Sequence, residues 1–141
     1  MSRKKARELT MCLVFEKECQ KDKNIGEIYD YLFEEFIGDL FSKESIKEPD
    51  EVYIKSTFSG VFEHLDEIDA LISGAAVGWS YDRISKISKA LLRIAVYEIK
   101  YAGDIPVPIA INEAVELSKK YDDFDAYTFI NGVLGAVANN K

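Results

Sequence analysis

Apolar residues recur along this chain at the three- and four-residue spacing of α-helices, and no stretch shows the strict alternation of a half-buried strand. Polar turns, glycines and prolines interrupt this spacing. The pattern predicts an all-α protein of about seven helices, at residues 3–20, 25–38, 50–63, 65–75, 82–102, 108–121 and 125–138. Since no repeat, low-complexity tract or linker separates them, we expect residues 1–141 to form one helical domain.

The predicted helix ends have local causes. A polar turn at 21–24 and a polar loop at 42–49 separate the first three helices, and the glycines within 74–78 loosen the chain before the fifth. Gly103 is suited to end the fifth helix, because glycine readily adopts the left-handed conformation found after helix C-termini. Pro106 then fits the approach to the next helix start.

The helix at 82–102 is apolar on two sides, which is typical of a helix at the centre of a small fold. Glu98 falls on one apolar face, where an isolated carboxylate would be costly unless it were paired or hydrogen-bonded. We therefore expect Glu98 to be a buried structural anchor. Between the apolar sides runs a basic stripe, which we interpret as a solvated face: Lys86, Lys89, Arg93 and Lys100.

Charge is unevenly distributed along the chain. The composition, 48% hydrophobic and 30% charged, indicates a folded globular protein, and the formal net charge is −7. The first ten residues carry +3, which leaves −10 on the other 131; the charged residues of this start are Arg3, Lys4, Lys5, Arg7 and Glu8. A basic terminus on an acidic body is either an arm that binds a polyanion or a solvated tail, and composition favours neither.

Residues suited to catalysis or metal binding are few. The single histidine, His64, stands among acidic neighbours, and no cysteine pairs with a histidine at metal-ligand spacing. The segment GAAVGWS at 74–80 lacks the Gly-Lys-Ser/Thr end of a phosphate-binding loop. We therefore predict that the protein is not an enzyme and uses neither a metal nor a cofactor.

The sequence also bears on the compartment. No apolar run approaches the roughly 20 residues that span a bilayer, and the start MSRKKARELT lacks the apolar core of a secretory signal. Cys12 and Cys19 lie about 10 Å apart along one predicted helix, too far for a disulfide, and are interpreted as packing residues in a reducing compartment. We expect a cytoplasmic protein.

Two helices carry features that their own packing does not require. The first helix has apolar residues on more than one side, so Phe15 either docks another protein or is covered by an internal helix. In the last helix, Gly132 and Gly135 each cost about 1 kcal/mol relative to alanine. We interpret these glycines as points of close helix packing.

Four stretches of the chain form a recognisable set: RKKAREL at 3–9, WSYDRISKISKALLRIAVYEI at 79–99, PVPIAINEAVELSKKY at 106–121 and FINGVLGAV at 129–137. Together they span nearly the whole sequence, and the pairing of LLRIAVYE with INEAVELSKKY and FINGVL at these spacings is highly specific. In these stretches the chain resembles the transcription antitermination factor NusB family. The resemblance implies an all-helical fold of two small three-helix bundles and a non-enzymatic, RNA-binding function.

The resemblance also implies partners and site residues. Members of the family bind the boxA element of ribosomal RNA leader transcripts together with NusE, a small-subunit ribosomal protein, and help RNA polymerase to read through terminators. By this resemblance the RNA-binding residues are Arg3, Lys4, Lys5 and Arg7, with Asp125 and Phe129 at the edge of the RNA site. The residues that match positions near the partner protein are Phe15, Asp82 and Ser88. The arm mixes lysine with arginine, so fewer bidentate phosphate contacts are expected.

Two alternatives stay open at this point. NusB-like domains also occur fused to ribosomal RNA methyltransferases, but that activity needs a nucleotide-binding glycine loop, which this sequence lacks. The second alternative is a helical scaffold that binds only protein. Measured RNA affinity would distinguish such a scaffold from an RNA-binding antitermination factor. The sequence is compatible with a monomer or a homodimer, and with more than one preferred RNA sequence.

Overall fold

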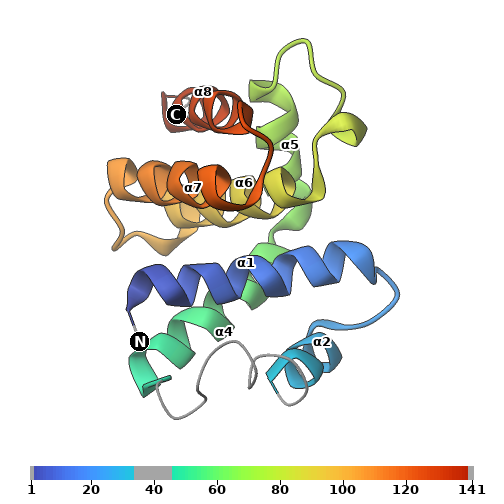
Figure 1. The fold of residues 1–141 in the computed structure, drawn as a ribbon, viewed down its shortest axis with the longest axis vertical. Helices are drawn as coiled ribbons and strands as arrows, with labels where there is room; N and C mark the ends of the chain where they lie inside the picture. The colour runs from blue at the N-terminus through green and yellow to red at the C-terminus, as the bar shows by residue number, and fades with distance from the viewer. Residues whose placement is uncertain (1, 34–45, 140–141) are drawn as a thin grey trace. The chain divides into compact units, whose positions relative to one another are not determined.

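The computed structural model describes residues 2–33 and 46–139, and within these ranges every regular element is helical (Figure 1). This confirms the predicted all-α class. The α-helices are α1 (Arg3–Cys19), α2 (Ile25–Tyr31), α4 (Glu48–Glu63), α5 (Leu65–Ala75), α6 (Lys86–Tyr97), α7 (Val107–Tyr121) and α8 (Ala126–Asn139). A 3₁₀ turn, Tyr81–Arg83, precedes α6, and a π-helical turn, Glu98–Ala102, follows it.

The chain divides into two compact units, Met1–Ser59 and Gly60–Lys141. The first unit contains α1, α2 and most of α4, and its buried side chains include Leu9 and Leu13 of α1, Ile28 of α2 and Phe58 of α4. The second unit contains the end of α4 and the four helices from α5 to α8. Apolar burial therefore supplies each unit with a core of its own.

Side-chain caps fix several helix starts. The Ser2 hydroxyl accepts a hydrogen bond from the Lys5 backbone N–H at 3.1 Å, and α1 begins between them. Asn24 caps α2 in the same way, accepting from the Glu27 backbone N–H at 2.9 Å. The α4 helix begins at Glu48, two residues earlier than predicted, because Pro49 is tolerated in a first helical turn. Residues 34–38 of the predicted second helix lie outside the described residues.

The start of α6 differs from the predicted position 82. Residues 81–83 form a separate 3₁₀ turn, and Ile84 is extended, with φ −73° and ψ 131°. Ser85 then caps the helix by accepting a hydrogen bond from the Ser88 backbone N–H at 3.0 Å. At the other end, Gly103 has φ +74° and closes the helical segment, as predicted.

The α6 helix is the centre of the second unit and packs against α5, α7 and α8. Leu92 and Val96 are fully buried, and most of their neighbours around the helix are no more than 8% exposed. Glu98 is 1% exposed, which confirms that this carboxylate is buried. The predicted solvated face was wrong for two of its four members, because Lys89 and Arg93 are buried.

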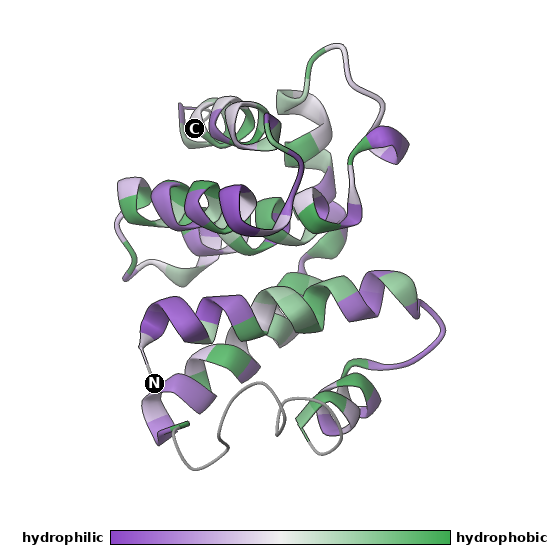
Figure 2. Ribbon diagram, viewed as in Figure 1, coloured by the Kyte–Doolittle hydropathy of each residue, from purple (hydrophilic) through white to green (hydrophobic). Residues whose placement is uncertain are grey.

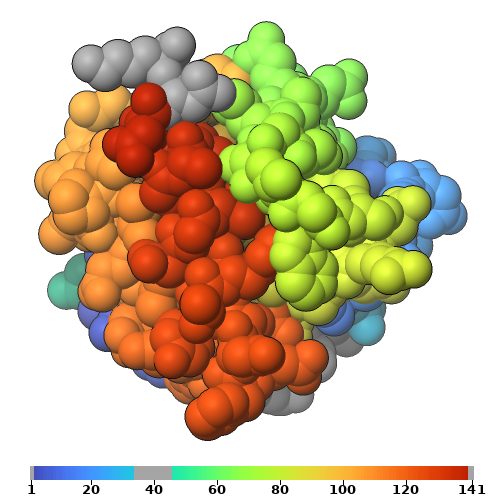
Figure 3. Space-filling view, turned by 90° about the horizontal axis from the view of Figure 1, so that it is seen from above, coloured from blue at the N-terminus to red at the C-terminus, as the bar shows by residue number. Residues whose placement is uncertain are grey.

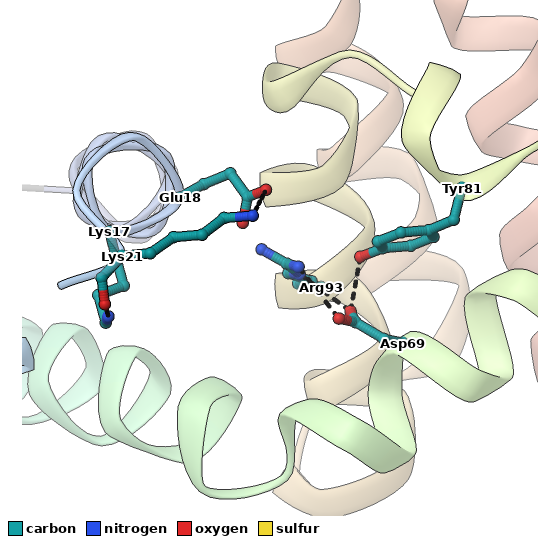
Figure 4. A network of polar contacts seen from close by, with 6 residues as sticks. All are labelled: Lys17, Glu18, Lys21, Asp69, Tyr81 and Arg93. Atoms are coloured by element: carbon teal, nitrogen blue, oxygen red, sulfur yellow. Dashed lines mark hydrogen bonds and ion pairs between the residues drawn. The ribbon is translucent and has the colours of Figure 1, made fainter.

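Arg93 is buried in a defined polar network (Figure 4). Its guanidinium donates from Nε and Nη2 to the two carboxylate oxygens of Asp69, each at 3.0 Å. The Tyr81 hydroxyl donates to Asp69 Oδ1 at 2.6 Å, and the Lys89 ammonium lies 4.6 Å from the centre of the Tyr81 ring. The basic stripe of α6 is therefore partly a structural feature, which helical phase alone could not reveal.

The glycines of α8 were also misinterpreted. A Cβ built on Gly132 or Gly135 would meet no other atom within 4 Å, so neither glycine marks a close approach. The close approach occurs at Gly60 instead, where a Cβ would collide with the Tyr97 ring. Glycine is required at position 60 because an aromatic side chain occupies the space of its missing Cβ.

Candidate nucleic-acid interface

The first candidate surface is the start of α1, here called the basic arm: Arg3, Lys4, Lys5 and Arg7. Figure 2 shows this end of α1 as strongly hydrophilic. No acidic residue lies in the first turn of the helix, although a helix N-terminus favours negative charge. The cations are therefore placed where they do not serve helix stability, and this favours a role in binding an anion.

The side chains of the basic arm are not equally accessible. Arg3, Lys4 and Lys5 are exposed, whereas Arg7 is only 7% exposed. The Lys5 ammonium lies 3.5 Å from a carboxylate oxygen of Glu8, one turn further along α1. Three cations thus reach the solvent directly, and the fourth is held against the protein.

Two residues of α4 hold the arginines of the basic arm. The Arg3 guanidinium carbon lies 4.4 Å from the centre of the Tyr53 ring, and Arg3 Nε lies 3.8 Å from Asp50 Oδ1. The Arg7 guanidinium carbon lies 5.6 Å from the same ring centre. Sequence reasoning missed Tyr53 and Asp50, since nothing in their spacing links position 53 to a helix that starts fifty residues earlier.

The second candidate surface is a cleft of about 490 Å³ in the second unit, here called the aromatic cleft. It lies where the 79–88 segment meets the start of α8, and its lining includes Trp79, Arg83, Ser88, Asp122, Asp125 and Phe129. In the space-filling view of Figure 3, α8 (red) lies between α7 (orange) and the green-to-yellow residues of α5 and the segment after it. The cleft brings together three of the residues suggested by the resemblance: Ser88, Asp125 and Phe129.

Two aromatic rings line the aromatic cleft. The Trp79 and Phe129 ring centres are 5.1 Å apart and the planes are inclined by 55°, while Trp79 is 57% exposed. Exposed aromatic side chains are the usual platforms for unpaired bases and for protein partners alike. Sequence reasoning did not identify Trp79 as a site residue. The available signal was a tryptophan directly after Gly78, a glycine that has φ +84° in the structure.

Acidic residues also line the aromatic cleft. The hydroxyls of Ser85 and Ser88 both donate to Asp122 Oδ2, the first of them at 3.0 Å. Asp123 and Asp125 also line the cleft, against one arginine, Arg83. This surplus of negative charge does not by itself attract a polyanion, and it is better matched to a basic partner.

The residues expected near a partner protein have different surroundings. Ser88 is 4% exposed and reaches the cleft through its bond with Asp122, while Asp82 is exposed in the 3₁₀ turn. Phe15 is partly exposed on α1. Phe15 shares its unit with the basic arm, and Asp82 shares the other unit with the aromatic cleft.

Cysteines and possible ligand groups add little to these two surfaces. Burial, together with Glu8 and Glu16, raises the pKa of the Cys12 thiol to about 11, and Cys19 is exposed; both are free thiols. Among residues 2–33 and 46–139, no three His, Cys, Asp or Glu side chains form a group that could hold a metal ion. No helix in the described part of the chain is long and apolar enough to cross a membrane.

The family model described as the NusB family matches residues 4–139, nearly the full chain. The chain belongs to the NusB family. It is 40% identical over 141 residues to the transcription antitermination protein NusB of Acetivibrio thermocellus, covering 100% of this chain and 91% of that protein. It is also 40% identical over 138 residues to NusB of Ruminiclostridium cellulolyticum, covering 98% and 89%.

Solved NusB structures share the fold. The structure of T. maritima NusB superposes with a TM-score of 0.87 at 27% identity, covering 99% of this chain and 92% of that one. A structure of the antitermination factors NusB and NusE in complex with double-stranded RNA gives a TM-score of 0.82 at 27% identity, covering 99% and 97%. The likeness to NusB thus extends over the whole length of the fold.

Proposed function

We propose that this protein is a transcription antitermination factor that binds boxA-type RNA of ribosomal RNA leader transcripts together with the ribosomal protein NusE. In this role it acts in the cytoplasm with the RNA polymerase antitermination complex, and residues 1–141 work as one RNA-binding domain without catalysis. The observation that carries the proposal is the basic arm, a helix start with three exposed cations. The chain aligns over 99% of its length with one chain of a solved complex of NusB, NusE and RNA.

The basic arm supplies the electrostatic contribution to RNA binding. Arg3, Lys4 and Lys5 are exposed, and Arg7 completes the set of four cations. Asp125 and Phe129 add contacts at the edge of the RNA, where Phe129 offers a ring for base stacking next to Trp79. Because most of the charge is confined to one helix start on an acidic chain, RNA affinity of the protein alone is modest.

A basic partner protein completes the RNA site. Phe15 of α1 provides an aromatic contact, and Asp82 and Ser88 lie in the acidic region around the start of α6. Charge complementarity favours a basic protein at such a surface, and a ribosomal protein has this character. RNA and partner then bind with positive coupling, which increases the affinity for RNA by about 5- to 150-fold.

The experiment is a titration of boxA RNA at several salt concentrations, with and without NusE. Four phosphate contacts predict a slope of about −3 in a plot of log affinity against log salt concentration. Replacing Arg3, Lys4, Lys5 and Arg7 by alanine should flatten this slope. The matched control removes the same charge from exposed lysines elsewhere: Lys23, Lys55, Lys119 and Lys120.

The control variant should keep most of the affinity and the slope. Equal losses in both quadruple variants would show that the basic arm has no special role and that net charge alone governs binding. No measurable RNA binding, with intact binding of NusE, would favour the alternative of a scaffold that binds only protein.

Phe15→Asp should weaken NusE binding strongly and RNA binding alone hardly at all.

A further inference from the structure

Tyr53 lies beneath two cations of the basic arm. The ring is on α4, and its residue is 7% exposed, whereas the Arg3 side chain above it remains 44% exposed. Arg3 and Arg7 are four residues apart on α1 and therefore lie on one face of that helix. Their guanidinium carbons lie 4.4 and 5.6 Å from the Tyr53 ring centre. One buried ring thus contacts both arginines of the basic arm.

This contact leaves Arg3, the more exposed of the two arginines, able to bind phosphate. A guanidinium attracted to the face of a ring keeps its N–H donors, which lie in its own plane, for other partners. The Asp50 carboxylate is 3.8 Å from Arg3 Nε, which is longer than a hydrogen bond. Asp50 therefore attracts Arg3 by charge without forming the close bidentate pair that a phosphate would have to displace.

We propose that Tyr53 is a positioning residue for RNA binding, whose ring, in contact with Arg7 as well, holds Arg3 in place for a phosphate contact. The inference rests on the proposed function, since it concerns RNA contacts of the basic arm. Long arginine side chains lose much conformational freedom when they bind a ligand, and a platform that restricts them beforehand lowers this cost. Tyr53 thereby increases RNA affinity although it contributes no charge and touches no RNA.

The test changes the electrons of the ring and keeps its shape. Tyr53→Phe retains the negative ring face, whereas pentafluorophenylalanine at position 53 fills a similar space but no longer attracts cations. The Phe variant should bind boxA RNA within about twofold of the unaltered protein. The pentafluoro variant should bind about 3- to 30-fold more weakly than the Phe variant, the loss expected when one or two long side chains must be ordered during binding instead of beforehand.

Three readouts separate positioning from a structural effect. The slope of log affinity against log salt concentration should be unchanged in the pentafluoro variant, because the number of cations is the same. In an Arg3→Ala, Arg7→Ala background, fluorination should cause no further loss of RNA affinity, since the ring then has no arginine to hold. In the free protein, fluorination should also shift the side-chain NMR signals of Arg3 and Arg7 away from their ring-shifted positions.

The outcomes decide between the two proposals. Equal RNA affinity of the Phe and pentafluoro variants would overturn the positioning role while leaving the proposed function intact. A loss of affinity that persists without both arginines would overturn it as well, because the ring would then act through the fold. If the unaltered protein did not bind boxA RNA at all, the proposed function would fail first and the inference with it.

Discussion

Two sites in the molecule combine the same three kinds of side chain, an arginine, a tyrosine ring and an aspartate. In the first unit, Arg3 lies over Tyr53 beside Asp50. In the second unit, Arg93 lies 5.9 Å from the centre of the Tyr81 ring and pairs with Asp69. The side chain of Arg93 is 4% exposed and that of Arg3 is 44% exposed.

The difference between the two sites lies in how far each arginine is satisfied within the protein. Arg93 makes two charge-assisted hydrogen bonds of 3.0 Å with one carboxylate, and Tyr81 donates a third bond to the same group. Arg3 has a looser ion pair at 3.8 Å and a ring contact. The closed arrangement serves the fold, and the open one keeps a cation available for a ligand.

The largest expected effect is on the closed site. Arg93→Ala should lower the free energy of unfolding by about 3 kcal/mol, near the lower end for a broken buried pair because the Asp69 side chain is 26% exposed. The measurement is urea unfolding followed by circular dichroism. Arg83→Ala, which removes an exposed arginine of the same unit, is the control and should change stability by less than about 0.5 kcal/mol. Similar effects of both substitutions would remove the distinction between closed and open arginines.

A smaller effect is expected from the third bond of the closed site. Tyr81→Phe removes the hydroxyl that donates to Asp69 and should cost about 1 kcal/mol at pH 8. Burial and this hydrogen bond raise the pKa of the Tyr81 phenol well above its ordinary value of 10. The folded protein therefore holds the phenol proton more tightly than the unfolded chain does, so this stabilisation is complete below pH 10 and decreases as the pH rises beyond it.

The stability difference between the unaltered protein and Tyr81→Phe should thus shrink above pH 10, by at most about 1.4 kcal/mol per pH unit for one proton. Other tyrosines with a raised pKa, such as Tyr29 at about 12, are present in both proteins and cancel in the comparison. A difference that stays constant from pH 8 to pH 11 would show that the Tyr81 phenol is not held in its protonated form by the fold.

Sequence patterns predicted the helices and the basic arm, but not the buried site around Arg93. Helical periodicity located the helices within about four residues, apart from the end of the second, which lies outside the described residues. Gly103 marked the end of the fifth predicted helix because its conformation is a local property. The basic residues of the arm were evident as a cluster of charge. The role of Arg93 was misjudged, since helical phase shows which residues share a face but not which neighbouring helix covers that face.

Contacts between distant residues were the part that sequence could not supply. The partners Asp69 and Arg93 are 24 positions apart, and Tyr53 meets Arg3 across a longer separation, so no local spacing signals either pair. The same limit explains the glycines. Gly60 faces the Tyr97 ring of a later helix and looked ordinary, whereas Gly132 and Gly135 looked significant and face open space.

The smallest expected effect on stability belongs to the open site. Arg3→Ala should change the free energy of unfolding by less than about 1 kcal/mol, because a half-exposed ion pair at 3.8 Å is weak and a cation near a helix N-terminus opposes the helix dipole. Urea unfolding of Arg3→Ala beside Arg93→Ala gives the direct comparison. The same Arg3→Ala protein should nevertheless lose RNA affinity and reduce the salt slope by about 0.7, the contribution of one phosphate contact. A loss of stability as large as that of Arg93→Ala would make Arg3 a structural residue. It would contradict the proposal that Arg3 is a cation available to RNA.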